Sequence, residues 1–124
     1  MNQVPMTNQS RKASPFDLSQ RTLEFGKRII KLAKSLPNDS VNRNLVSQIV
    51  RSGTSVGANY CEADESDTKK DFKYRIMICR KEAKETNYWL NLIIEANPGL
   101  NNRIQSLLNE SRELVKIFAS ISRK

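Results

Sequence analysis

Three glutamates near the middle of the chain, Glu62, Glu82 and Glu85, are the side chains best suited to acid or base chemistry. Histidine, the commonest general base, is absent from the sequence, so proton transfer would fall to Asp, Glu, Lys or Tyr. A di-iron bundle also needs Glu-x-x-His pairs, which this composition excludes. We therefore interpret these carboxylates as salt-bridge partners of basic side chains such as Arg51. We predict neither enzymatic activity nor a metal or other cofactor.

The two cysteines, Cys61 and Cys79, have no C-x-x-C spacing and no histidine to complete a metal site. We interpret them as free thiols of an intracellular protein. The N-terminal residues contain no apolar run of signal-peptide length, and no segment approaches the roughly 20 apolar residues that span a bilayer. The sequence therefore predicts a cytoplasmic protein with no membrane association.

The stretch RSGTSVGANYCEADES, residues 51–66, has two glycines that invite comparison with a phosphate-binding loop. A P-loop needs the pattern G-x-x-x-x-G-K-[ST] after a strand. Gly53 and Gly57 are one residue too close together, no lysine follows them, and no strand pattern precedes them. At about 100° per residue, both instead share a helix face with Ile49 and Val56. Since an interior glycine costs a helix roughly 1 kcal/mol relative to alanine, we expect a neighbouring helix to approach closely here.

A polar set lies on another side of the same predicted helix, within an arc of about 80°. It comprises Arg51, Ser55, Asn59 and Glu62, and we assign Glu85 of the next helix to the same polar seam. One interpretation is a solvated face, the usual place for such residues. The other is a hydrogen-bonded seam against a second helix or subunit.

At 124 residues the chain suits a single domain. Residues 1–14 are polar and lack periodicity, which predicts a disordered N-terminal tail. Across residues 15–124, hydrophobic periodicity predicts four helices joined by short connections and no strand. This pattern is typical of an all-α fold, an antiparallel up-down-up-down four-helix bundle.

The predicted helix ends follow from proline and capping residues. The first helix stops before Pro37, and the second starts near residues 38–40, which are all good N-cap types. Ser66 is expected to cap the third and longest helix. The segment ANPGLN interrupts the apolar pattern, and Asn101 or Asn102 is expected to cap the fourth helix.

The third predicted helix carries a second apolar face opposite its core stripe. This face consists of Tyr74, Ile78, Tyr88, Trp89 and Leu92. Either neighbouring helices of the same chain cover it, or it is the interface of a homo-oligomer. Tyr and Trp are enriched at the centres of protein interfaces, which favours self-association.

Positive charge is unevenly distributed along the chain. The net charge is +8, with +5 in residues 11–36, +3 in residues 97–124 and none between them. The first helix projects a basic row formed by Arg21, Lys27, Arg28, Lys31 and Lys34. This row could follow the phosphate backbone of RNA or DNA, or it is a solvated lysine face. No RNA-binding motif with interleaved aromatic residues and no recognition helix is evident. Nucleic-acid binding would therefore depend on contacts to the phosphate backbone and would be sensitive to salt.

The segments IVRSGTSVGANYCEADES and DFKYRIMICRKEAKETNYWLNLI resemble a family of four-helix-bundle proteins. Its members were first recognised as products of intervening sequences in bacterial 23S ribosomal RNA genes and were once called S23 ribosomal protein. The similarity extends over residues 16–118. In the family pattern a glutamate is followed by a run of aromatic and aliphatic residues, and Glu85 and Trp89 lie at the corresponding positions of this chain. Many relatives have Glu-Gly where this chain has Glu62 and Ala63.

The resemblance implies a homopentameric ring of bundles with a basic surface and no assigned enzymatic activity. A similar fold occurs in the accessory protein of diversity-generating retroelements, which binds reverse transcriptase and nucleic acid. We therefore expect a non-enzymatic, oligomeric, nucleic-acid-associated scaffold. The alternative is a protein–protein interaction module without a nucleic-acid ligand. A third hypothesis, an enzyme using carboxylates in a bundle pocket, requires clustered acids with raised pKa values.

Overall fold

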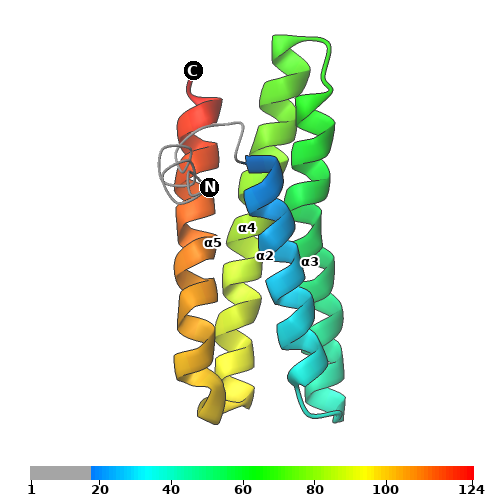
Figure 1. The fold of residues 1–124 in the computed structure, drawn as a ribbon, viewed down its shortest axis with the longest axis vertical. Coiled ribbons are helices and arrows are strands. Elements are labelled where there is room, and N and C mark those ends of the chain that lie inside the picture. The colour runs from blue at the N-terminus through cyan, green and yellow to red at the C-terminus, as the bar shows by residue number, and fades with distance from the viewer. Residues whose placement is uncertain (1–17) are drawn as a thin grey trace, which may run out of the picture.

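Four long α-helices make up residues 18–124, the part of the chain that the computed structural model describes (Figure 1). They are α2 (Leu18–Ser35), α3 (Ser40–Asp64), α4 (Lys69–Ala96) and α5 (Asn101–Ser122), and a 3-10 turn, η2 (Pro98–Leu100), precedes α5. No strand occurs in this range, so the predicted all-α class is confirmed. The predicted disordered tail, residues 1–14, lies outside the described residues.

The helices lie along one long axis, and the chain turns back at each connection (Figure 1). Helix α3 packs on both α2 and α4, and α4 also packs on α5, whereas α2 and α5 have few backbone contacts. Long side chains connect α2 to α5 instead. Arg21 donates to Glu110 from Nε at 2.7 Å and from Nη2 at 2.9 Å, and Arg28 donates to Ser106 Oγ.

The core is apolar along the whole bundle. Its largest fully buried side chains include Phe25 of α2, Ile49 of α3, Leu90 of α4 and Phe118 of α5. On each helix the buried residues recur at helical spacing, so each helix buries one face against the others. Burial of a side chain of this size stabilises the fold by about 1.5–3 kcal/mol. None of the described helices has the length and apolar content needed to cross a membrane.

Hydrogen-bonded polar pairs interrupt this core where α3 packs on α4. Thr86 Oγ1 of α4 lies 2.9 Å from Ser52 Oγ of α3, and the amides of Asn42 and Asn97 exchange hydrogen bonds of 3.2 and 2.8 Å. Within residues 18–124, no buried side-chain nitrogen or oxygen lacks a partner. Because an unpartnered buried polar group costs about 1–3 kcal/mol, these pairs fix the register between α3 and α4.

Two helix starts differ from the sequence prediction. Thr68, and not Ser66, caps α4, where its Oγ1 accepts a backbone hydrogen bond of 3.0 Å. Ser66 still belongs to the turn that ends α3, and its Oγ donates to a carbonyl of that helix. Helix α5 has no side-chain cap, because η2 leads directly into it through Leu100. The start of α3 is as predicted, with Asp39 as its N-cap.

Helices α2 and α3 approach closely at the two glycines of α3, as the sequence predicts. A Cβ added at Gly53 would lie 2.9 Å from two side-chain carbons of Ile29, and one at Gly57 would lie 3.1 Å from Thr22 Oγ1. Both glycines are interior residues of α3. They are contact positions between helices and do not form a phosphate loop.

Candidate functional site

The polar seam centres on Arg51, whose side chain reaches from α3 to α4. One guanidinium nitrogen, Nη1, lies 3.3 Å from Glu82 Oε1, and the other pairs with Glu85 Oε2. The same oxygen of Glu85 accepts a hydrogen bond of 2.8 Å from Trp89 Nε1. These four side chains form one network between the two helices.

The remaining residues of the predicted seam lie along the same surface but outside this network. Ser55 Oγ donates to the Arg51 carbonyl at 2.7 Å, and Asn59 Nδ2 donates to the Ser55 carbonyl at 2.9 Å. Arg75 Nη1 of α4 lies 3.4 Å from Asn59 Oδ1. The interpretation of Glu62 as a salt-bridge partner is wrong for the described part of the chain, where its side chain is exposed and forms no ion pair.

The titratable groups near the seam are poorly suited to catalysis. Glu82 and Glu85 are both engaged by the same guanidinium. Burial raises the pKa of the Cys79 thiol to about 12, so the nucleophilic thiolate is scarce at neutral pH. Burial, together with the Asp64 charge, also raises the pKa of Tyr60. Residues 18–124 contain no group of three or more potential ligands that could hold a metal ion.

The apolar face predicted on the third helix divides into two parts. Ile78, Trp89 and Leu92 are half-buried, and Trp89 packs on the core. Tyr74 and Tyr88 project into solvent and are 62% and 57% exposed. Neighbouring helices therefore cover one part of this face and leave the two tyrosines uncovered.

The predicted basic row of α2 is only partly available to a ligand. Arg21 and Arg28 reach across to α5, and Lys27 Nζ lies 3.5 Å from a glutamate of α2 in an exposed ion pair. Lys31 and Lys34 are exposed and form no ion pair within residues 18–124. Within residues 18–124 the row thus contributes two exposed lysines without an ion pair, a weakly paired Lys27, and Arg28, whose charge its neutral partner Ser106 does not offset.

A second basic surface lies on α4 and escaped the sequence analysis. It is formed by Lys70, Lys73, Arg80, Lys81 and Lys84, none of which forms an ion pair with a described residue. Counted along the sequence, residues 64–96 are neutral, because seven acids offset seven cations. In the structure, however, Glu82 and Glu85 face Arg51 of α3. A helical wheel gives the missing signal, because the five cations fall within about 100° of the α4 surface.

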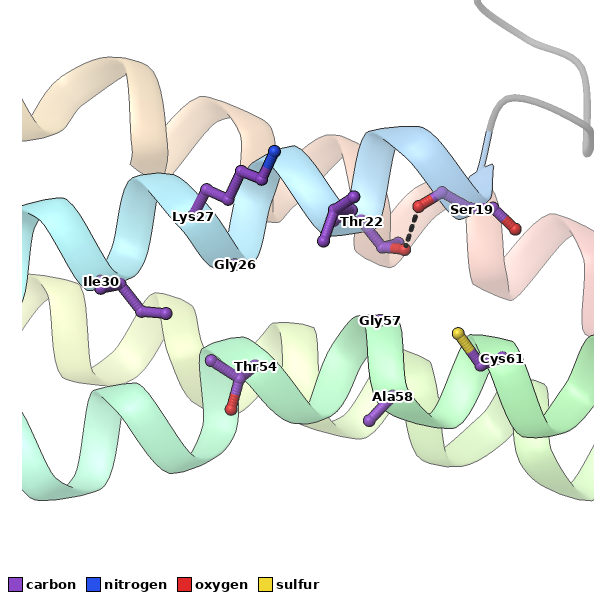
Figure 2. Close-up of a pocket in the computed structure, with 10 residues that line it drawn as sticks. Ser19, Thr22, Gly26, Lys27, Ile30, Thr54, Gly57, Ala58 and Cys61 are labelled. Carbon is purple, nitrogen blue, oxygen red and sulfur yellow. Dashed lines mark hydrogen bonds between the residues drawn. The ribbon is translucent and has the colours of Figure 1, made fainter.

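The outer surfaces of α2 and α3 enclose an open groove of about 230 Å³ (Figure 2). Figure 2 shows Gly26 and Gly57, both of which line the groove, on the two facing helices. Leu23 and Ile30 of α2 line the groove and remain 51% and 42% exposed. The free thiol of Cys61 lies at the same groove.

Comparisons with known proteins agree with this architecture. The family profile described as 23S rRNA-intervening sequence protein matches residues 15–120. A crystal structure of a protein of unknown function from the S23 ribosomal protein family of Bacteroides thetaiotaomicron is similar, with a TM-score of 0.81 and 37% sequence identity. The match covers 89% of this chain and 98% of that chain. The curated proteins include no match. The chain therefore belongs to the 23S rRNA-intervening sequence protein family.

Proposed function

We propose that this protein is a non-enzymatic helical bundle that acts as an oligomeric, nucleic-acid-associated scaffold. The proposal rests on one observation: carboxylates between the helices are paired with arginines, while the outer surface carries lysines. Arginines engage Glu82, Glu85 and Glu110, whereas most lysines of α2 and α4 project outward without an ion pair in the described range. With a net charge of +8, such an exterior suits a polyanionic partner.

The chemistry of the residues between α3 and α4 supports a structural role for them. A general base needs a suitable pKa and access to substrate. Glu82 and Glu85 are held by Arg51, and the Cys79 thiol is buried and protonated. We therefore assign these residues to the stability of the α3–α4 contact.

The proposed particle is an assembly of antiparallel up-down-up-down bundles, and the family resemblance favours a homopentameric ring. A ring would repeat the same cations several times, so weak phosphate contacts would add through avidity. We favour the groove between α2 and α3 as the subunit contact, because Lys27 is its single cation. The tyrosines of α4, by contrast, lie among five cations.

Light scattering of the purified protein tests this assembly. The expected mass is that of several chains, and five would match the ring. Leu23→Ser should lower the mass if the groove is the contact, whereas Tyr74→Ala or Trp89→Ala should lower it if the α4 face is. A monomeric wild-type protein would contradict the scaffold proposal.

Fluorescence anisotropy with labelled RNA and DNA tests the nucleic-acid association. At low salt the protein should bind, and a Lys31→Ala, Lys34→Ala double variant should bind more weakly to all sequences, because lysines contact phosphates. The matched control is Glu113→Ala, which removes an exposed carboxylate of α5 and should not weaken binding. No binding of either nucleic acid at low salt would reject the proposal.

The second candidate function is a protein–protein interaction module without a nucleic-acid ligand. The apolar groove beside Leu23 and Ile30 favours it, because contiguous exposed apolar surface is typical of protein contacts. Two results together would support this alternative. The first is that the protein binds no nucleic acid. The second is that it captures one specific protein from nuclease-treated lysate, and that the Ile30→Ser variant no longer captures this protein.

A further inference from the structure

We propose that the solvent face of α4 between Lys70 and Tyr88 binds single-stranded nucleic acid, with Tyr74 and Tyr88 as stacking platforms for its bases. This inference rests on the proposed nucleic-acid association. It assigns that association a surface and a class of ligand.

The order of residues on α4 alternates aromatic and basic side chains along the helix. Seven residues make nearly two turns, so residues seven apart form rows parallel to the helix axis. One row consists of Tyr74, Lys81 and Tyr88, and the adjacent row consists of Lys70, Met77 and Lys84. The two rows together present flat rings and ammonium groups on one side of the helix.

Charge on this face is positive over its whole length. Its cations have no ion pair within residues 18–124, and Glu82 and Glu85 are turned to Arg51. The next acid on the tyrosine row is Glu95, two turns beyond Tyr88. The two tyrosines are fourteen positions apart, so the tract is about 21 Å long at 1.5 Å per residue. This length suits several nucleotides of an extended strand.

Both tyrosines are exposed, and each ring lies beside a neighbouring side chain of α4. Tyr74 is 62% exposed, and the guanidinium carbon of Arg75 lies 6.0 Å from its ring centroid. Tyr88 is 57% exposed and meets Trp89 nearly edge-on, with ring centroids 5.0 Å apart. Trp89 is itself held by its hydrogen bond to Glu85. Rings that are already positioned lose less conformational entropy when a base stacks on them.

The chemistry of this face favours a single strand over its competitors. Exposed bases stack on aromatic rings irrespective of sequence while cations follow the backbone. A duplex keeps its base faces inside the helix, so it would engage the cations and not the tyrosines. A two-fold contact with a second copy would bring these five cations against the same cations, which opposes that packing, and in the proposed ring the α2–α3 groove supplies the subunit contact.

The experiment compares the affinity of the full chain for labelled oligo(dT), oligo(U) and a duplex of equal length at low salt. Single strands should bind more tightly than the duplex. Tyr74→Ala and Tyr88→Ala should each weaken single-strand binding by about fivefold or more, with little effect on the duplex. Tyr74→Phe and Tyr88→Phe should bind as the wild type does, because they keep the ring. Val41→Ala is the matched control, since it removes another large apolar side chain, 57% exposed, from α3.

The possible outcomes separate this inference from the proposed function. If the protein binds nucleic acid but prefers no single strand, or the alanine variants bind as the wild type does, the inference fails and the proposed function stands. If no nucleic acid binds, both fail. If the alanine variants also lower the particle mass in light scattering, the face is a subunit contact and the inference is overturned. Tighter binding of oligo(dT) or of oligo(U) identifies the preferred backbone and supports the inference in either case.

Discussion

The indole Nε1 of Trp89 donates a hydrogen bond of 2.8 Å to Glu85 Oε2, the oxygen that also pairs with Arg51. One glutamate thereby connects α3 to an aromatic side chain one turn further along α4. Tyr88 lies against Trp89 in turn, with ring centroids 5.0 Å apart. The polar seam is therefore the structural support of the outer α4 face.

Glu85→Ala should destabilise the protein by about 1 kcal/mol and shift the Trp89 emission to the red. The substitution removes the acceptor of the indole N–H and one partner of Arg51, both on a partly exposed surface. Trp89 is the single tryptophan, so denaturation followed by its fluorescence measures both effects. Glu85→Gln keeps an acceptor oxygen and should remain closer to the wild type in emission.

Glu113→Ala is the control for this experiment. It breaks an exposed pair with Lys116 at 3.8 Å, so it should change the free energy of unfolding by less than about 0.5 kcal/mol. Equal effects of Glu85→Ala and Glu113→Ala would show that the seam contributes nothing beyond a surface ion pair.

Gly53→Ala should destabilise the protein by about 1–3 kcal/mol because the new methyl group overpacks the α2–α3 contact. Its Cβ would lie 2.9 Å from two carbons of Ile29, a β-branched side chain with little freedom to move. Gly26→Ala is the matched control, since its Cβ would meet Thr54 at an ordinary 3.9 Å. That variant should be neutral or gain up to about 1 kcal/mol from helix propensity. Chemical denaturation measures both, and a Gly53→Ala variant as stable as Gly26→Ala would contradict the close approach.

The free energy of unfolding should fall as the pH rises above about 9 because of Cys79. Burial raises the pKa of its thiol to about 12, while the unfolded thiol titrates near its ordinary pKa of about 8.5. Between these values the folded state binds more protons than the unfolded state. Stability should therefore decrease by up to about 1.4 kcal/mol per pH unit. Denaturation at about pH 8 and about pH 10 should show a smaller decrease for Cys79→Ala than for the wild type or for Cys61→Ala. The same decrease in all three proteins would exclude Cys79 as its cause.

The helices and their buried stripes could be predicted from sequence because they depend on local spacing. Ile49, Leu90 and Phe118 recur at helical intervals with their neighbours and lie in the core. The cap of α4 could not be predicted in this way. Ser66 and Thr68 are both good caps, and the choice depends on how far α3 continues before the chain turns.

The candidate surfaces were less accessible to sequence reasoning. A net charge summed over a segment hides which face each residue occupies, so the basic side of α4 cancelled against the seven acids of residues 64–96. The ion pairs of Arg51 with Glu82 and Glu85 agree with the interpretation from sequence. Glu62, interpreted in the same way, forms no ion pair within residues 18–124, because pairing across helices depends on the rotation of one helix against the other. The engagement of Arg21 by Glu110 joins positions 89 residues apart and has no local signal.

Titration of labelled single-stranded RNA or DNA with the full-length protein at several salt concentrations tests the central claim most directly. A strand that contacts about five cations should lose roughly 100-fold in affinity between about 50 and about 200 mM salt, because each phosphate contact releases counterions. The account predicts a linear fall of log affinity with log salt and a slope near −3.5 for about five contacts. Absence of binding at the lowest salt, or an affinity that salt does not change, would contradict it.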